Sequence, residues 1–317
     1  MNQVIEPPFG DIWDGLREGR VIPFLGAGAS LVGRNPAQAW QPTDSAFPPN
    51  GAELAHYLAE RSGFPAQDPH DSDDLAKVSS YAADISGRPM LRRRLRTVLN
   101  HPYQCGALHK LLAEIPTHLM IVVTNYDTLL EDAFRAAGKP FDLIVYPAER
   151  AAFGNSLLWW PSGQKEPVPI EAKELDLDFD KTTVIYKMHG TVWPEGEQWD
   201  NFVITEEDYI EFLSRMTTNT SSAVPAQFYQ YSRNRSFLFL GYSLRDWNLR
   251  VVLRNLRRQF EGSGTPDQSG ENDVPSWAIQ WKPSPLEQKL WDRRNVNIFD
   301  MDLNEFVTKL SAWKNRG

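Results

Sequence analysis

Short apolar runs that alternate with longer helix-like segments are the feature that most constrains the fold of this chain. The runs expected to be strands are 21–25, 119–124, 143–145, 183–188, 202–204, 236–240, 277–280 and 297–299. The segments expected to be helices include 8–18, 51–61, 88–99, 104–113, 127–137, 206–215, 246–259, 285–294 and 303–313. This alternation is typical of α/β proteins with a mainly parallel sheet flanked by helices.

The first two clear strands are separated by a stretch that is nearly all helical in pattern, from about residue 51 to 112. We interpret it as a helical module inserted into one domain that spans 1–317, with the insertion covering about 40–115. Three stretches are expected to be loops, because they combine Pro, Gly and polar residues: 33–50, 161–180 and 261–273.

Charge and cysteine content exclude several classes of protein. The net charge of −8 argues against a general nucleic-acid binder, which needs a basic field to meet phosphates. A local basic run, Arg92-Arg93-Arg94 with Arg96, is interpreted as a solvated helix face, the alternative being a docking surface for an acidic partner or DNA. Cys105 is the only cysteine, so neither an internal disulfide nor a cysteine-rich zinc site is available, and no metal is expected.

The location expected from the sequence is the cytoplasm. The first residues lack the basic start and apolar core of a signal peptide. No apolar run approaches the roughly 18 residues that a membrane span needs. A single thiol also fits a reducing compartment.

A glycine-rich turn follows the first expected strand, in the sequence VIPFLGAGAS. Glycines let a backbone pass close to a pyrophosphate, and backbone N–H groups stabilise its charge. The pattern is GxGxS, shorter than the full dinucleotide fingerprint, so a tight turn of any α/β protein is the alternative. The residues that would contact the ligand are Gly26, Ala27, Gly28 and Ser30.

Polar residues follow the next two buried runs. Asn125 comes after IVVT, at the carboxyl end of the expected strand, where ligands bind in open α/β sheets. Asp127 is placed to cap the helix expected from Thr128, and is also a candidate ligand-binding residue. His189 follows TVIYKM in the same way, and a neutral imidazole there can take a proton from water near pH 7.

The fourth motif is SFLFLGYSLRD. Gly241 permits a close backbone approach, and Ser243 can bond a phosphate or ribose oxygen. Asp246 either reaches a ribose hydroxyl or caps the following helix. Together, four strand ends with small or polar residues would lie on one edge of a parallel sheet, which predicts a Rossmann-like fold that binds a dinucleotide or nucleotide.

These motifs, in their order and spacing, resemble the sirtuin family, and more closely its zinc-free prokaryotic branch, the sirtuin-like NADases of antiphage defence. The matching residues are GAGAS at 26–30, TNYD at 124–127, HG at 189–190, and GYS at 241–243 with Asp246. The resemblance runs from about residue 20 to 300.

The resemblance implies that NAD is bound as a substrate and cleaved to nicotinamide and ADP-ribose. It implies that Asn125 positions the attacking water or the nicotinamide ribose, and that His189 is the catalytic base. The glycine turn would lie at the pyrophosphate, and Gly241 with Ser243 near the adenosine side. By the same analogy the protein depletes NAD when activated, and is regulated as a homo-oligomer or by a partner such as a HerA-type ATPase or a short Argonaute.

Two departures from the protein deacylases of the family argue against lysine deacylation. Those enzymes carry a zinc ribbon of two cysteine pairs, which one cysteine cannot supply. They also carry a Pro-Asp-Phe-Arg element after GAG, where this chain reads LVGRNPAQAW. NAD cleavage needs neither feature.

Three other functions remain open at this point. A non-catalytic sensor of NAD or ADP-ribose would keep the glycines but would need neither Asn125 nor His189. An ADP-ribosyltransferase would share the first half of the reaction and pass the sugar to a macromolecule. An unrelated nucleotide-binding protein is the third alternative, although the absence of GxxxxGK[ST] disfavours an ATPase.

Overall fold

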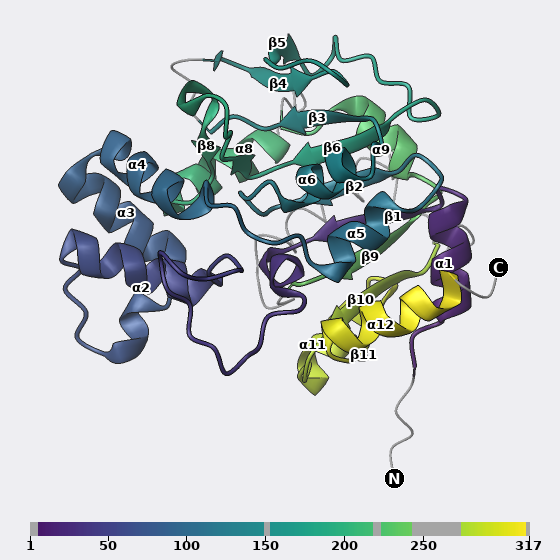
Figure 1. The fold of residues 1–317 in the computed structure, drawn as a ribbon, viewed down its shortest axis with the longest axis horizontal. Coiled ribbons are helices and arrows are strands. Elements are labelled where there is room, and N and C mark those ends of the chain that lie inside the picture. Colours follow the sequence, from purple (N-terminus) through teal and green to yellow (C-terminus); the bar gives the residue numbers. More distant parts are fainter. Residues whose placement is uncertain (1–5, 149–152, 218–222, 243–273, 315–317) are drawn as a thin grey trace.

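The structure is a computed structural model that describes residues 6–148, 153–217, 223–242 and 274–314. Within these residues, nine strands form one sheet in the order β11-β10-β9-β1-β2-β6-β3-β4-β5 (Figure 1). The strands from β11 to β3 are mutually parallel, and β4 and β5 are added antiparallel at one edge. The expected α/β, Rossmann-like fold is therefore confirmed.

The elements have the following bounds. The strands of the main sheet are β1 (Val21–Leu25), β2 (Met120–Val123), β3 (Phe141–Val145), β4 (Ser156–Trp160), β5 (Val168–Glu171), β6 (Thr183–Lys187), β9 (Ser236–Leu240), β10 (Ser276–Gln280) and β11 (Val296–Asp300). A separate antiparallel pair consists of β7 (Gly190–Thr191) and β8 (Asn201–Phe202). The helices are α1 (Phe9–Arg17), α2 (Gly51–Ser62), α3 (Leu75–Ser86), α4 (Arg88–Leu99), α5 (Ala107–Ala113), α6 (Leu129–Ala136), α8 (Glu206–Thr217), α9 (Ala226–Ser232), α11 (Pro285–Asp292) and α12 (Leu303–Lys314), with short 3₁₀ turns η1 (Ala27–Leu31), η2 (Pro69–Ser72) and η3 (Glu197–Trp199).

Two cores lie on the two faces of the sheet. One packs α1, α5, α6 and α12 against one face, and the other packs α8, α9 and α11 against the opposite face (Figure 1). Alternate residues of a strand point to opposite faces, so in β1 Val21 and Leu25 join the first core while Ile22 and Phe24 join the second. Burial on both faces explains why the central strands are continuous apolar runs.

The helices α2, α3 and α4, here called the helical module, lie beside the sheet and share a core of their own (Figure 1). The module begins at a capping box, in which Asn50 and Glu53 each accept a hydrogen bond from the other's backbone N–H. Its core extends to Val192, Phe202 and Ile204, in and beside the β7–β8 pair. The module therefore contacts the segment that follows His189.

Two arginines of the module add polar contacts to that segment. The guanidinium of Arg88 lies 2.8 Å from Asp208, and that of Arg96 lies 2.9 Å from Asp200, whose carboxylate is fully buried. Arg96 also donates to the carbonyl of Trp193. For Arg96, the interpretation of the basic run as a solvated face is therefore wrong, because this arginine is held in an internal ion pair.

Several expected elements differ from the structure. The stretch 161–180, expected to be a loop, contains β5, and β4 and β7 were not expected. The run 202–204 is not a strand of the main sheet, because β8 pairs only with the two residues of β7. The expected helix 246–259 and loop 261–273 lie outside the described residues.

Candidate functional site

The motifs that follow β9, β1, β2 and β6 lie on one edge of the sheet, because these four strands are neighbours in that order. Leu25 is in register with Leu240 on one side and Val123 on the other, and Val123 is in register with Lys187. All four strands are parallel, so their carboxyl ends meet at this edge. The expectation that the four motifs share an edge is confirmed.

The glycines of the first and fourth motifs pack against each other. Gly28 donates to the carbonyl of Gly241 at 2.9 Å. A Cβ on Gly26 would lie 2.7 Å from the carbonyl oxygen of Gly241, and a Cβ on Gly241, whose φ is +76°, would lie 2.1 Å from the nitrogen of Ala29. Glycine is required here for backbone-to-backbone contact. Ala27 remains exposed on the turn, which leaves a side open to a ligand.

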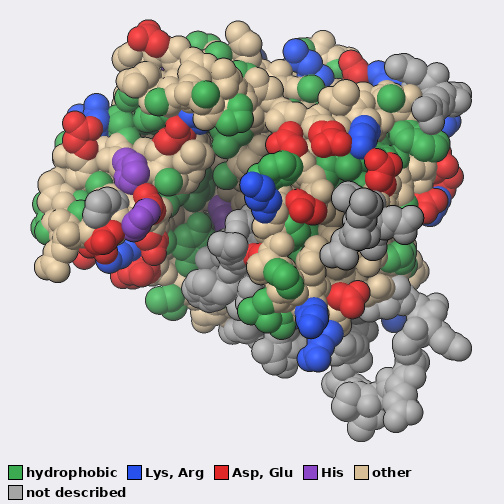
Figure 2. Space-filling view, turned by 90° about the horizontal axis from the view of Figure 1, so that it is seen from below, with side chains coloured by type: hydrophobic (Ala, Val, Ile, Leu, Met, Phe, Trp, Pro, Cys, Tyr) green, Lys and Arg blue, Asp and Glu red, His purple; other side chains and the backbone are tan. Residues whose placement is uncertain are grey.

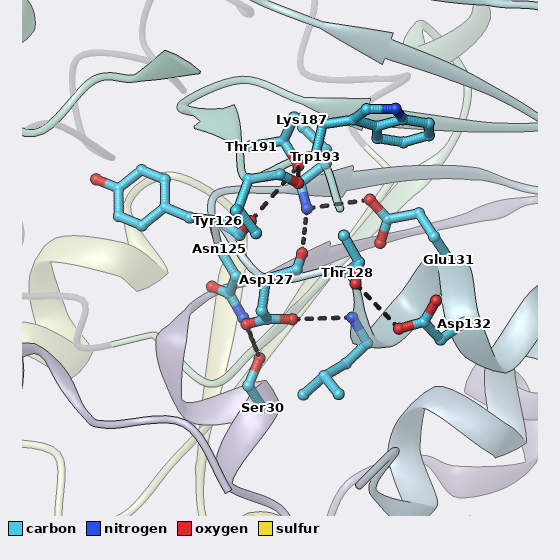
Figure 3. A network of polar contacts seen from close by, with 12 residues as sticks. Ser30, Asn125, Tyr126, Asp127, Thr128, Glu131, Asp132, Lys187, Thr191 and Trp193 are labelled. Carbon is cyan, nitrogen blue, oxygen red and sulfur yellow. Dashed lines mark hydrogen bonds and ion pairs between the residues drawn. The ribbon is translucent and has the colours of Figure 1, made fainter. Parts of the chain in front are cut away.

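Asn125 is buried, and its amide nitrogen is held by two acceptors. Nδ2 donates to the carbonyl of Gly26 at 3.0 Å. It also donates to Oγ of Ser30 at 2.7 Å (Figure 3). The amide oxygen Oδ1 is also buried and has no hydrogen-bond partner within the described part of the chain. A buried acceptor without a partner is costly, so this oxygen is a candidate contact for a ligand or water.

Asp127 makes both local and long-range contacts. One carboxylate oxygen accepts from Ser30 Oγ at 2.8 Å, and the other accepts from the N–H of Leu129 at 3.1 Å (Figure 3). The helix α6 starts at Leu129, one residue later than expected, with Thr128 at the N-cap. Asp127 thus satisfies a first-turn N–H of α6 and at the same time orients the hydroxyl that holds Asn125.

His189 lies where β6 leaves the sheet. The next residue, Gly190, has φ of +88°, and a Cβ there would lie 2.0 Å from the carbonyl oxygen of Asn201, so only glycine fits. The imidazole packs edge-on against Tyr209 at 5.3 Å and Phe212 at 5.5 Å, both on α8. Burial among these rings lowers the pKa of His189 to about 3, so the imidazole is neutral near pH 7.

Asn125 and His189 occupy matching positions on neighbouring strands. Each follows by two residues a member of the register pair Val123 and Lys187. The two segments stay together past the strands, because Val192 N–H donates to the carbonyl of Tyr126 at 2.9 Å. The structure joins Gly26, Ser30, Asn125 and Asp127 in one hydrogen-bonded cluster; the His189 ring lies outside it.

The surface is hollowed between the helical module and the body of the sheet domain, and a histidine side chain is visible deep in this hollow (Figure 2). In the described ranges, no group of three or more His, Cys, Asp or Glu side chains is arranged to hold a metal ion. No helix in those ranges is long and apolar enough to cross a membrane. Ser243 and Asp246 lie outside the described residues.

A buried ion pair next to this cluster was missed by the sequence reasoning. Nζ of Lys187 lies 3.0 Å from Oε1 of Glu131 on α6, and it also donates to the backbone carbonyl of Asp127 (Figure 3). A signal was present in the sequence: Lys187 is a charged residue in an otherwise apolar strand, and Glu131 lies among the apolar residues of LLEDAF. Charged residues are almost never fully buried unless they are paired.

Known proteins with sequences similar to this chain include NAD(+) hydrolases and a defense-associated sirtuin. Defense-associated sirtuin 2 of Bacillus subtilis is 23% identical over 316 residues, which cover 96% of this chain and 26% of the relative. NAD(+) hydrolase ThsA of Bacillus cereus (strain MSX-D12) is 24% identical over 319 residues, which cover 99% of this chain and 55% of the relative. NAD(+) hydrolase ThsA of Acinetobacter baumannii (strain 532279) is 26% identical over 195 residues, 60% of this chain and 33% of the relative.

This chain spans from about a quarter to about half the length of these curated relatives. A family model described as a SIR2-like domain matches residues 119–299, which is more than half of the chain and includes Asn125, His189 and Gly241. By this match and by its sheet topology, the chain belongs to the SIR2-like domain family.

Proposed function

We propose that this chain is a NAD⁺ glycohydrolase, which breaks the bond between nicotinamide and C1′ of the attached ribose and releases nicotinamide and ADP-ribose. The observation that carries the proposal is the buried, unpartnered Oδ1 of Asn125, at a strand end next to the one that bears a buried neutral histidine. The names of the relatives, NAD(+) hydrolase and defense-associated sirtuin, support the same activity.

In this proposal Asn125 orients the reacting groups. Its Nδ2 is fixed by Gly26 and Ser30, so the amide cannot rotate without losing two hydrogen bonds. The free Oδ1 then accepts a hydrogen bond from a ribose hydroxyl or from the attacking water. Holding reactants in one geometry removes an entropic part of the barrier.

His189 is proposed to accept the proton. In NAD⁺ the nicotinamide ring is cationic and leaves as a neutral molecule, so no acid is needed to protonate it. Water adds its oxygen to C1′, and its proton passes to the imidazole and then to solvent. A base with a pKa of about 3 is weak, so the proposal requires the negative diphosphate of the bound substrate to raise the pKa of His189.

The diphosphate is proposed to lie at the exposed side of the turn from Gly26 to Ser30, at Ala27 and Gly28. Asp127, Gly241, Ser243 and Asp246 complete the proposed NAD-binding set. Gly241 acts through the shape it gives to the turn, because its backbone contacts Gly28.

The test is release of nicotinamide from NAD⁺ by the purified protein. We expect Asn125→Ala and His189→Ala each to abolish measurable release while circular dichroism shows an unchanged fold. His118→Gln, a histidine at the opposite edge of the sheet just before β2, is the matched control and should keep wild-type turnover. Full turnover by either well-folded site variant would remove that residue from the mechanism.

The products separate the alternatives. Free ADP-ribose supports the hydrolase, a modified protein or nucleic acid indicates an ADP-ribosyltransferase, and tight NAD binding without turnover indicates a sensor.

We further propose that the protein is a cytoplasmic antiphage effector. It is held inactive until it self-assembles or binds a partner, such as a HerA-type ATPase or a short Argonaute. Light scattering of the purified protein, alone and co-expressed with the product of a neighbouring gene, tests this. A strict monomer under all conditions would contradict it.

A further inference from the structure

Lys187 and Glu131 form an ion pair in the interior of the protein, with side chains 0% and 1% exposed. Within the described residues, the ammonium group contacts two acceptors: the carboxylate of Glu131 and the backbone carbonyl of Asp127 (Figure 3). The carboxylate oxygens of Glu131 have no other hydrogen-bond partner within the described residues. Burial raises the pKa of Glu131, and the charge of Lys187 opposes that shift.

Stability alone does not explain this pair. Moving two charges out of water costs about as much as their mutual attraction returns, and apolar residues of similar volume fill such a site equally well. Apart from the buried His109, the surrounding residues are the apolar core beneath α5 and α6, which would accept such side chains. A buried ion pair of this kind instead fixes the relative position of the segments that it joins, and those segments are identified by the atoms in contact.

Those atoms belong to the two segments that carry the proposed catalytic residues. Lys187 lies on β6, two residues before His189. The carbonyl that its ammonium holds belongs to Asp127, two residues after Asn125. The carboxylate of the same Asp127 holds Ser30, whose hydroxyl accepts from the Asn125 amide (Figure 3).

We propose that the Lys187–Glu131 pair is a positioning device for the reaction. It holds residues 124–128, here called the Asn125 loop, at a fixed distance from the end of β6, so that the Asn125 amide and the His189 imidazole contact the same ribose. This inference rests on the proposed function. Neither residue contacts the substrate. Glu131 fixes the ammonium from the side of α6, and Lys187 transmits that constraint to Asp127.

The expected effect on kcat and KM depends on which part of the site the pair holds. The diphosphate is proposed to bind at Ala27 and Gly28, where the turn contacts the backbone of Gly241, whereas Lys187 reaches the turn only at its far end, through Asp127 and Ser30. Loosening the pair should therefore leave KM nearly unchanged and lower kcat. A displacement of about 1 Å in a catalytic group can cost about 100-fold in rate.

The decisive variant replaces both charges, Lys187→Met with Glu131→Met. It leaves the net charge unchanged and no buried charge unpaired, while the Asp127 carbonyl loses its donor, so its unfolding midpoint should stay near that of the wild type. We expect kcat to fall between about 10- and 100-fold, KM to change less than threefold, and the pH profile of kcat to keep its shape. Equal kcat in the folded double variant would overturn the proposal.

The matched control is Lys139→Met. This half-buried lysine also donates to backbone carbonyls, those of Ile115 and Thr117, but at the opposite edge of the sheet. We expect it to lose some stability and to keep kcat within twofold of the wild type. A similar fall of kcat in this control would show that any lysine-to-carbonyl contact matters, and would overturn a specific role for Lys187.

A second readout does not depend on turnover. Hydrogen exchange of the amides of 125–129 should speed up at least tenfold in the double variant and remain unchanged in the Lys139→Met control. If the wild type cleaves no NAD, the proposed function fails, and the exchange measurement alone decides whether the pair orders the Asn125 loop. Unchanged exchange in the double variant would refute that ordering.

Discussion

The histidine at the end of β6 should make the protein lose stability as the pH falls. In the folded protein, burial against Tyr209 and Phe212 lowers the pKa of His189 to about 3, whereas an exposed histidine in the unfolded chain titrates near 6.5. Above pH 6.5 both states are neutral, and His189 makes no pH-dependent contribution. Between pH 6.5 and 3 only the unfolded chain takes up the proton, so the free energy of unfolding decreases as the pH falls.

The magnitude follows from the two pKa values. One pKa unit corresponds to about 1.4 kcal/mol, so at pH 5, which is 1.5 units below the unfolded value, His189 should reduce the free energy of unfolding by about 2 kcal/mol. The full shift sets a ceiling of about 5 kcal/mol near pH 3. Glutamine at this position has no proton to gain, so His189→Gln should lack this loss.

The assay is urea unfolding of the wild type and of His189→Gln at pH 7.5 and at pH 5. Every other titrating group, including the buried His109, is present in both proteins and cancels in the difference of differences. The wild type should lose about 2 kcal/mol more than the variant between the two pH values. An equal loss in both proteins, or a larger loss in the variant, would show that His189 is not buried as a neutral group.

Three further substitutions test separate parts of the site and of the module. Gly190→Ala places a Cβ 2.0 Å from the carbonyl of Asn201 at a φ of +88°, so the free energy of unfolding in urea should fall by more than about 2 kcal/mol. A smaller fall would show that this position does not require glycine. Ser30→Ala leaves Asn125 Nδ2 without one acceptor, and should lower the free energy of unfolding by about 2 kcal/mol and lower kcat for NAD; unchanged kcat would argue against the proposed orientation of the amide. Asn50→Ala removes the capping box of α2 and should cost about 1 kcal/mol in urea with wild-type turnover, and a loss of turnover would link the module to catalysis.

The core of the sheet could be predicted from the sequence because its strands are continuous apolar runs that end at polar or glycine residues. The runs 21–25 and 236–240 coincide with β1 and β9. The edge strands could not be predicted in the same way. β5 contains a proline and is largely exposed, so it lacks both the apolar run and the strict alternation that identify a strand.

The site was predictable only in part for a different reason. A sequence shows which residues follow strands, but not which strands are neighbours. The contact of Gly28 with Gly241 depends on β1 lying beside β9, and the Lys187–Glu131 pair depends on β6 lying beside β2 and beneath α6. The sequence shows that Lys187 and Glu131 are charged residues within apolar segments, but it does not show that they contact each other.

The helical module is an excursion between β1 and β2, two strands that are adjacent in the sheet. It leaves from the carboxyl end of β1, at the edge where the four motifs gather, and the chain regains the sheet at the start of β2 after α5. A change in the length or sequence of this excursion would leave the strand pairing intact. The wall that the module adds to the hollow can therefore vary in length and sequence while the sheet on the other side of the hollow stays the same.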